Sequence, residues 1–196
     1  KQHKTMEANL RASIARFVPL DDKEFAHLYR QGEVMPLKKG EVLFREGQRC
    51  DYLYFVVEGL LKYFYLVDGE ERIGQFFFEN AWATDLYSFL SREGSKMNMG
   101  AIETSTLLAF SRAAIQQLYK DIPKLERFGR LMVEHTFVSS QQRSASFLTL
   151  SHAERYELIV RTRPKVIARV PQYMIAAYLG IKPESLSRIR KKRRDK

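Results

Sequence analysis

The sequence predicts an α+β chain: an antiparallel β-roll or jelly roll, then a long helix, then a C-terminal winged-helix-like domain with a helix-turn-helix. Residues 33–110 hold short runs rich in Val, Phe and Tyr that glycines separate, which favours many short antiparallel strands. Residues 124–149 place apolar side chains at helical spacing, and residues 169–194 suggest two short helices joined by a tight turn. We therefore expect three parts, at residues 1–122, 123–149 and 150–196.

The strands of the roll are predicted from apolar runs and the turns between them. The runs are VMPL, EVLFREG, CDYLYFVVEG, LLKYFYLVDG, RIGQFFF and AIETSTLLAFS. Asp68-Gly69 is a strong signal for a two-residue hairpin turn, because both central residues of such a turn need a positive φ. We expect Trp82 and the aromatic run 76–78 to pack in the core of the roll.

Helices are predicted on both sides of the roll. Residues 7–31 carry a helical pattern that Pro19 interrupts, and shorter patterns cover 113–119 and 152–162. The long helix carries a stripe that is too apolar to face water, so part of it is a candidate subunit interface. An intrachain packing role is the alternative. The candidate interface residues are Leu125, Phe128, Leu131, Met132, His135 and Ser139.

The C-terminal stretch RVPQYMIAAYLGIKPESLSRIRKKRR has the pattern of a helix-turn-helix. Ile175 and Leu179 share one face of its first helix, and Leu186 and Ile189 share one face of its second. Gly180 stands where a helix end needs a left-handed residue. The two helices can therefore pack face to face around a tight turn.

Positive charge is concentrated in the same stretch. Residues 182–196 contain eight Lys or Arg and two acidic residues, a net charge of +6 out of +10 for the whole chain. Such a patch binds DNA because each neutralised phosphate releases counterions. The alternative is a basic tail on a solvated face, which we weigh low because the basic run continues an amphipathic helix.

Composition narrows the class of protein further. Hydrophobic residues make up 45% and charged residues 29%, as in soluble globular proteins. No apolar run approaches the ~20 residues of a membrane span, so no membrane partner is expected. The single cysteine, Cys50, excludes an internal disulfide and fits a cytoplasmic location. No signal peptide is visible, although residue 1 is not Met.

The order of these parts resembles the Crp/Fnr family of bacterial transcription regulators. KKGEVLFREGQRCDYLYFVVEGLLKYF is similar to that family's cyclic-nucleotide-binding β-roll. LSHAERYELI and VPQYMIAAYLGIKPESLSRIRK are similar to its DNA-binding domain. The resemblance covers nearly the whole chain and implies a homodimer held by the long helix, bound to a near-palindromic operator. RNA polymerase is a further candidate partner.

Matched to the family's turn motif, the second helix supplies the expected base-reading residues, and both helices and the turn supply the expected phosphate contacts. Glu184, Ser185 and Arg188 fall at or beside base-reading positions; Arg188 can donate two bonds to guanine and Glu184 can accept one from cytosine. The expected phosphate contacts are Gln172, Tyr173, Lys182, Lys191, Lys192 and Arg193.

The phosphate-binding cassette of the roll departs from the family pattern. Where cyclic-AMP-binding members carry Gly-Glu, the resemblance aligns Glu79-Asn80, and the closing Arg-Ser/Thr-Ala run is missing from SREGSKMNMGAIE. Without that arginine fork a cyclic phosphate lacks its main partner, so cyclic AMP is not expected to bind tightly. An effector of other chemistry, or a closed pocket with none, remains open. The candidate lining residues are Glu79, Asn80, Asp85, Ser88, Lys96, Ser140 and Gln141.

No other site is indicated. Cys50 alone cannot hold an iron–sulfur cluster, the four histidines are scattered, and no paired Cys/His spacing suggests zinc. We therefore expect no metal, no cofactor and no enzymatic activity. The sequence favours a dimeric, sequence-specific DNA-binding regulator. The alternatives are a cyclic-nucleotide-responsive regulator and a ligand-binding scaffold whose basic tail binds nucleic acid non-specifically.

Overall fold

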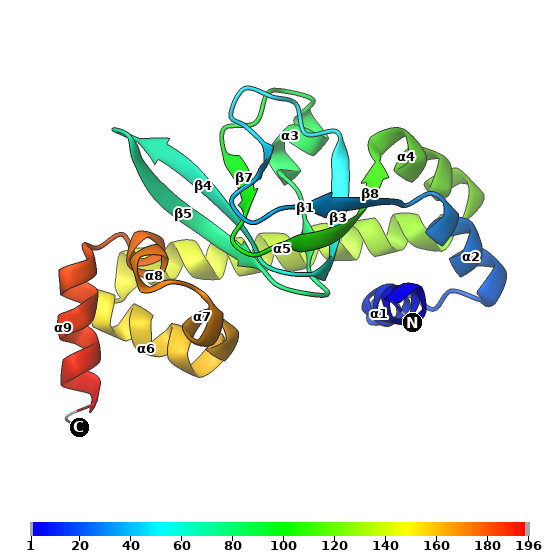
Figure 1. Ribbon diagram of the computed structural model, residues 1–196. Coiled ribbons are helices and arrows are strands. Elements are labelled where there is room, and N and C mark those ends of the chain that lie inside the picture. The colour runs from blue at the N-terminus through cyan, green and yellow to red at the C-terminus, as the bar shows by residue number, and fades with distance from the viewer. Residues whose placement is uncertain (1, 195–196) are drawn as a thin grey trace. The chain divides into compact units, whose positions relative to one another are not determined.

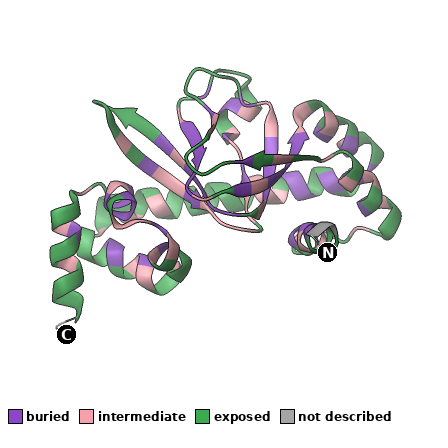
Figure 2. Cartoon of the chain, viewed as in Figure 1, coloured by how far each residue is buried: buried purple, intermediate pink, exposed green. Residues whose placement is uncertain are grey.

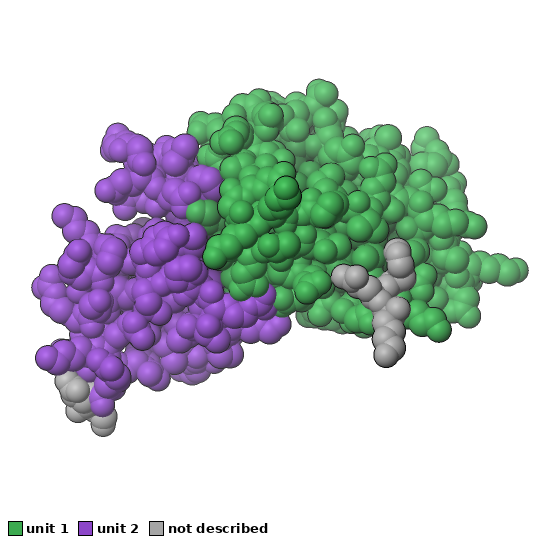
Figure 3. Space-filling model, viewed as in Figure 1, with its two compact units in different colours: residues 1–62, 77–136 green, residues 63–76, 137–196 purple. Residues whose placement is uncertain are grey.

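The computed structural model describes residues 2–194 and divides the chain into two compact units (Figures 1 and 3). The first unit comprises residues 1–62 and 77–136, and the second comprises residues 63–76 and 137–196. The domain limits predicted from the sequence coincide with the two ends of the long helix, whereas the compact units divide inside it.

Nine helices and eight strands lie within the described residues. The helices are α1 Gln2–Ala15, α2 Asp22–Arg30, α3 Leu86–Ser91, α4 Arg112–Asp121, α5 Pro123–Thr149, α6 His152–Thr162, α7 Pro164–Arg169, α8 Gln172–Leu179 and α9 Pro183–Arg194. The strands are β1 Glu33–Leu37, β2 Val42–Phe44, β3 Tyr52–Glu58, β4 Leu61–Val67, β5 Glu70–Phe77, β6 Trp82–Ala83, β7 Asn98–Ala101 and β8 Ser105–Ser111. The predicted long helix and the predicted helix pair at the C-terminus are both confirmed.

The core of the first unit is a four-stranded antiparallel sheet covered on one face by helices. Its strand order is β1-β8-β3-β6, and Phe55 of β3 lies opposite Leu108 of β8. Leu10 of α1 and Leu125 of α5 belong to the same buried cluster as these two residues. Burial of such side chains is the main favourable term in folding, at roughly 1.5–3 kcal/mol each. The first half of α5 is thus an integral part of this core.

Trp82 is partly buried and packs against this core, as predicted for the roll. Its indole ring lies 5.1 Å from the ring of Phe55 and 5.5 Å from that of Phe128, between ring centroids. The indole N–H donates to the hydroxyl of Ser13, with 3.0 Å between nitrogen and oxygen. A buried tryptophan needs such a partner for its polar end. The interaction ties α1, β6 and α5 together.

The second sheet has the strand order β2-β7-β4-β5, and two of its features differ from the prediction. The run AIETSTLLAFS was expected to be one strand, but the chain bends at residues 102–104 and places β7 and β8 in different sheets. Strand β7 itself was not predicted, because Asn98 and Gly100 are poor strand formers. Its four residues are all buried, so tertiary packing outweighs their low propensity.

The hairpin of β4 and β5 confirms the predicted turn. Asp68 has φ 53° and Gly69 has φ 78°, the pair of positive angles of a type I′ turn. Most of this hairpin, residues 63–76, belongs to the second unit. There Phe76 packs against Tyr178 of α8, with ring centroids 5.2 Å apart. Phe76 is buried as predicted, but it packs in the second unit and not in the core of the roll, and Phe77 and Phe78 are only half-buried.

The rest of the second unit is helical from α5 to α9. Helix α6 begins with a capping box in which Ser151 and Glu154 each accept from the other's backbone N–H. Ile175 and Leu179 of α8 and Leu186 of α9 form the buried centre of the helix-turn-helix. The described residues after α6 contain no strand, so the β-wing that a winged helix implies is not among them.

At one position of the roll, both a positive φ and a close neighbour disfavour any residue larger than glycine. Gly59, between β3 and β4, has φ 100°, and a Cβ there would lie 2.7 Å from the Cα of Ser105. We predict that Gly59→Ala lowers the free energy of unfolding by about 2 kcal/mol or more, since left-handed strain and a backbone clash add. Urea unfolding followed by the fluorescence of Trp82, the only tryptophan, measures it.

Gly40 is the matched control. Its φ is 81°, but a Cβ there would meet no atom within 4 Å. Gly40→Ala should therefore cost only the backbone strain, about 1 kcal/mol. Equal losses for the two variants would contradict the steric part of this account.

Candidate nucleic-acid interface

The turn between α8 and α9 is built by a glycine and two backbone hydrogen bonds. Gly180 has φ 71° and ψ 32°, the left-handed conformation predicted for it. The N–H of Ile181 donates to the carbonyl of Ala176 at 3.0 Å, and the N–H of Gly180 donates to that of Ala177 at 3.3 Å. This pair of bonds is the Schellman motif that ends a helix sharply. It lets α9 begin at Pro183 after a turn of only three residues.

Packing on α8 fixes which side of α9 faces outward. Leu186 is 1% exposed and points inward. At 100° per residue, Glu184, Arg188 and Lys191 lie within about 60° of one another on the opposite side. All three are exposed, and α9 is largely exposed apart from Leu186 (Figure 2). The outward face therefore carries one acid and two bases that the chain leaves accessible.

Arg193 does not lie on that outward face, and its assignment as a phosphate contact stays a prediction. It lies seven residues after Leu186, on the inward side of α9. Its guanidinium contacts the carboxylate of Glu157 of α6, with Nε 2.9 Å from Oε1 and 3.1 Å from Oε2. The arginine is thus neutralised within the chain and holds the end of α9 to α6. Periodicity alone could have placed it beside Leu186.

The other predicted phosphate contacts are arranged as follows. Tyr173, at the start of α8, is 58% exposed, and Lys182, Lys191 and Lys192 are exposed. Gln172 is half-buried, and its side-chain oxygen is buried without a hydrogen-bond partner in the described structure. All six predicted contacts, Arg193 included, therefore have side chains at or near the surface of the helix-turn-helix.

A hollow of about 260 Å³ adjoins the side of α9 that is predicted to read bases. It is lined by His152 of α6, Ile181 and Lys182 of the turn, and Ser185, Arg188 and Ile189 of α9. Ser185 is half-buried there, whereas Arg188 is exposed. Of the three predicted base-reading residues, Glu184 and Arg188 therefore protrude and Ser185 lies at the base of the surface.

The long helix α5 carries its apolar residues differently from the prediction. Leu125 is 2% exposed and Phe128 is 5% exposed, both in the core of the first unit. They cannot contact a second subunit, so their assignment to a dimer interface is corrected. Met132 packs against the same core, and the ring of His135 lies 6.5 Å from that of Phe17. The intrachain alternative holds for Leu125, Phe128 and Met132. Leu131 is half-buried and His135 and Ser139 are exposed, so their place in a dimer interface stays a prediction.

The second half of α5 leaves large apolar side chains uncovered. Phe137 is 62% exposed, Val138 is 53% exposed and Leu148 is 87% exposed. Phe137 and Leu148 are eleven residues apart, about three helical turns, and so lie on the same side of the helix. Sequence reasoning missed these residues, although their spacing was a usable signal.

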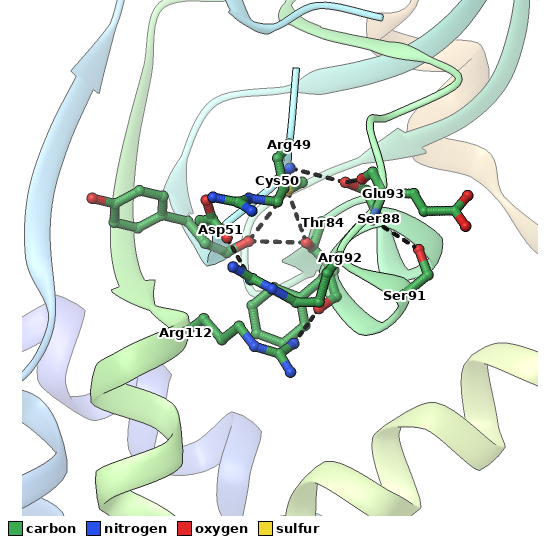
Figure 4. Close-up of polar contacts among 11 residues, drawn as sticks. Arg49, Cys50, Asp51, Thr84, Ser88, Ser91, Arg92, Glu93 and Arg112 are labelled. Atoms are coloured by element: carbon green, nitrogen blue, oxygen red, sulfur yellow. Dashed lines mark hydrogen bonds and ion pairs between the residues drawn. The ribbon is translucent and has the colours of Figure 1, made fainter. Parts of the chain in front are cut away.

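The loop around α3 corresponds to the predicted cassette, and its polar groups bind one another (Figure 4). Asp85 caps α3: its Oδ1 accepts from the backbone N–H groups of Tyr87 and Ser88, and its Oδ2 accepts from the hydroxyl of Ser95 at 2.7 Å. The Ser88 hydroxyl donates to the carbonyl of Glu93 and accepts from the N–H of Cys50. Both side chains are buried and already satisfied.

The cations of this loop are also engaged. The Arg92 guanidinium lies 2.5 Å from one oxygen of Asp51, and Arg49 lies 3.1 Å from the other. Partial burial opposes ionisation of Asp51, but hydrogen bonds from Arg92 and Arg49 outweigh it and hold the pKa of that carboxyl below its ordinary value. Lys96 is exposed, with its ammonium 5.1 Å from the ring centroid of Tyr87.

The remaining residues of the predicted effector pocket are distributed over both compact units. Glu79 and Asn80 form the turn between β5 and β6, where Asn80 has φ 68° and its N–H donates to the carbonyl of Val56. Ser140 and Gln141 are exposed on the second half of α5, which belongs to the second unit. The pocket itself stays a prediction.

Two further searches of residues 2–194 bear on function. No helix among them is both long and apolar enough to cross a bilayer. No group of three or more His, Cys, Asp or Glu side chains in the same residues is arranged to hold a metal ion.

Comparison with known proteins identifies relatives of both parts of the chain. The family model described as the cyclic nucleotide-binding domain matches residues 34–121. The transcriptional activator protein Anr of Pseudomonas protegens is 29% identical over 169 residues, which cover 79% of this chain and 67% of that protein.

Solved structures share the fold beyond the roll. The c-di-GMP responsive global regulator CLP of Xanthomonas campestris has a TM-score of 0.69 at 17% identity, covering 89% of this chain and 92% of that one. The catabolite activator protein of Thermus thermophilus has a TM-score of 0.57 at 20% identity, covering 88% and 83%. The predicted α+β architecture is confirmed over most of the chain.

The α3 loop leads to a prediction about cyclic AMP. The Asp85 carboxylate already occupies the N-terminus of α3, and Arg92 is neutralised by Asp51, so a cyclic phosphate would meet negative charge without a free arginine. We predict no saturable binding of cyclic AMP at micromolar concentrations by isothermal titration calorimetry. Micromolar affinity would contradict this account of the loop.

Proposed function

We propose that this chain, which belongs to the Crp/Fnr family of transcription regulators, binds double-stranded DNA sequence-specifically as a homodimer. In this proposal one α9 from each subunit enters successive major grooves of a near-palindromic operator. The observation that carries it is the outward face of α9, where Glu184, Arg188 and Lys191 are exposed opposite the packed Leu186. A DNA target and RNA polymerase as a further partner imply that the protein works in the cytoplasm.

The residues on that face have separate chemical tasks. The guanidinium of Arg188 can donate two hydrogen bonds to O6 and N7 of guanine, and the carboxylate of Glu184 can accept from N4 of cytosine. Lys191 and Lys192 both lie about two turns further along the helix than Glu184, and they suit phosphate oxygens on the groove edge. Arg193 is left out of this set because Glu157 holds it.

A frayed basic tail would not show this organisation. The Schellman turn, the buried Leu186 and the Arg193–Glu157 ion pair hold α9 on the body of its unit at three points. The charge of residues 182–194 is therefore presented on an ordered helix with a defined outward face. That order favours base reading over the alternative of a non-specific nucleic-acid-binding tail.

Pairing of two chains is supported by the second half of α5. Phe137, Val138 and Leu148 expose large apolar surface that a second copy of the same helix would cover. A two-fold axis would place the same surface of α5 from both subunits in contact. It would also present one α9 from each subunit to the same DNA duplex. One chain alone reads only half of such an operator.

Two substitutions on α9 test the separation of base reading from phosphate binding. A preferred duplex is first selected from random sequences with the wild-type protein. We predict that Arg188→Ala weakens binding to this duplex by about 1–3 kcal/mol and relaxes specificity at one base pair in each half-site. Fluorescence anisotropy against the selected duplex and a random duplex measures both effects.

Lys191→Ala is the matched control on the same face. It should weaken binding to the selected and the random duplex alike, and it should lower the slope of affinity against salt concentration by about one per subunit. If Arg188→Ala also weakens both duplexes equally, the assignment of Arg188 as a base reader is wrong.

A charge on α5 should separate the subunits. We predict that the double variant Phe137→Glu/Leu148→Glu sediments as a monomer while the wild type sediments as a dimer, because two pairs of carboxylates would be buried against each other. Leu90→Glu is the control, since Leu90 is 54% exposed on α3 and lies in the other unit. A double variant that stays dimeric would show that another surface pairs the chains.

A further inference from the structure

The second unit contains a cavity that the proposed function does not use. It has a volume of about 340 Å³ and is lined by the second half of α5, by α6, by Gln75 of β5 and by the end of α8. Three arginines line it: Arg143, Arg155 and Arg163. No acidic residue is among the described residues that form its wall. The volume lies within the range of small-molecule sites.

Arg155 is the most confined of the three arginines. It is only 8% exposed, and its Nε is buried without a hydrogen-bond partner in the described structure. Its guanidinium lies over the ring of Phe147, 4.4 Å from the centroid. A buried donor without an acceptor costs roughly 1–3 kcal/mol. An acceptor arriving in the cavity would remove that cost.

The other two arginines add donors and charge. Nη1 of Arg143 is also buried without a partner, and the guanidinium lies 5.9 Å from the ring centroid of Tyr63. Arg163 is held by neutral groups, because its Nη1 donates to Gln75 and to the hydroxyl of Tyr178 at 2.8 and 2.9 Å. These contacts orient Arg163 without cancelling its charge.

The acids nearest in sequence to Arg155 point elsewhere. Glu154 accepts from Ser151 in the capping box, and Glu157 binds Arg193 of α9. Residues 154 and 157 lie about 100° and 200° around α6 from residue 155, so neither shares its face. Neither Glu154 nor Glu157 therefore compensates the charge of Arg155 in the cavity.

We infer that this cavity binds a phosphorylated small molecule, with Arg155 and Arg143 donating to its phosphate oxygens. Guanidinium groups match phosphate geometry because they offer parallel N–H donors in a fixed plane. The hydroxyls of Ser139, Ser146 and Thr162 provide neutral contacts for the rest of the ligand. None of these residues is in the effector pocket predicted from the sequence or on the outward face of α9. The inference holds whether or not the chain binds DNA.

Isothermal titration calorimetry with inorganic pyrophosphate tests the site on the full chain at low ionic strength. We expect saturable binding at one site per chain. Arg155→Met and Arg143→Met should each weaken it about ten-fold or more, the loss expected for one hydrogen bond between charged groups. Arg155→Lys should weaken it as well, since an ammonium group keeps the charge but lacks the planar fork.

Arg188→Met is the matched control because it removes the same group from the exposed face of α9. It should leave pyrophosphate binding unchanged and should weaken DNA binding, whereas the two cavity variants should still bind the selected duplex. Circular dichroism verifies that each variant is folded. If Arg155→Met does not fold, Arg143→Met still tests the site. Absence of saturable binding by the wild type, or equal weakening by Arg188→Met, would overturn the inference.

Discussion

The structure depends on how one continuous helix divides its apolar side chains. In its first half, α5 buries Leu125 and Phe128 in the core of the roll, where they pack with Trp82 and the inner strands. In its second half it leaves Phe137 and Leu148 uncovered. Covering such exposed side chains with another surface lowers the free energy by about 25 cal/mol per Å² of apolar area buried. The same helix therefore completes the roll and offers the apolar surface that we propose a second copy covers.

Helix α9, like α5, packs one side on its own unit and exposes the other. Because Leu186 and Arg193 fix one side of α9 on its own unit, the opposite side must present Glu184, Arg188 and Lys191. In the roll, the polar groups that a ligand would need already bind other groups of the chain. Asp85 caps α3, and Asp51 forms an ion pair with Arg92. Arginines without a matching acid gather instead in the second unit. The distribution of satisfied and unsatisfied polar groups thus separates a structural loop from a candidate ligand site.

Features that depend on neighbouring residues could be predicted from the sequence, and those that depend on distant residues could not. Gly180 and Asp68-Gly69 were predicted correctly because a turn needs positive φ at those positions whatever surrounds them. Strand β7 was missed because its burial in the fold outweighs the weak strand propensity of its residues. Helix α3 was also missed; it has only six residues and is capped by Asp85. The assignment of Leu125 to a dimer interface was wrong because periodicity shows that a stripe is apolar, not which surface covers it. The base-reading residues and the effector pocket stay predictions.

Two copies of α9 are proposed to contact DNA at a fixed spacing, and a hydroxyl-radical footprint on the selected duplex measures that spacing. The account predicts two protected windows on one side of the duplex, with centres about 10–10.5 base pairs apart or a multiple of that distance. The two windows should appear together as protein is added, since one dimer covers both. A single protected window, or two windows that fill independently, would contradict the claim.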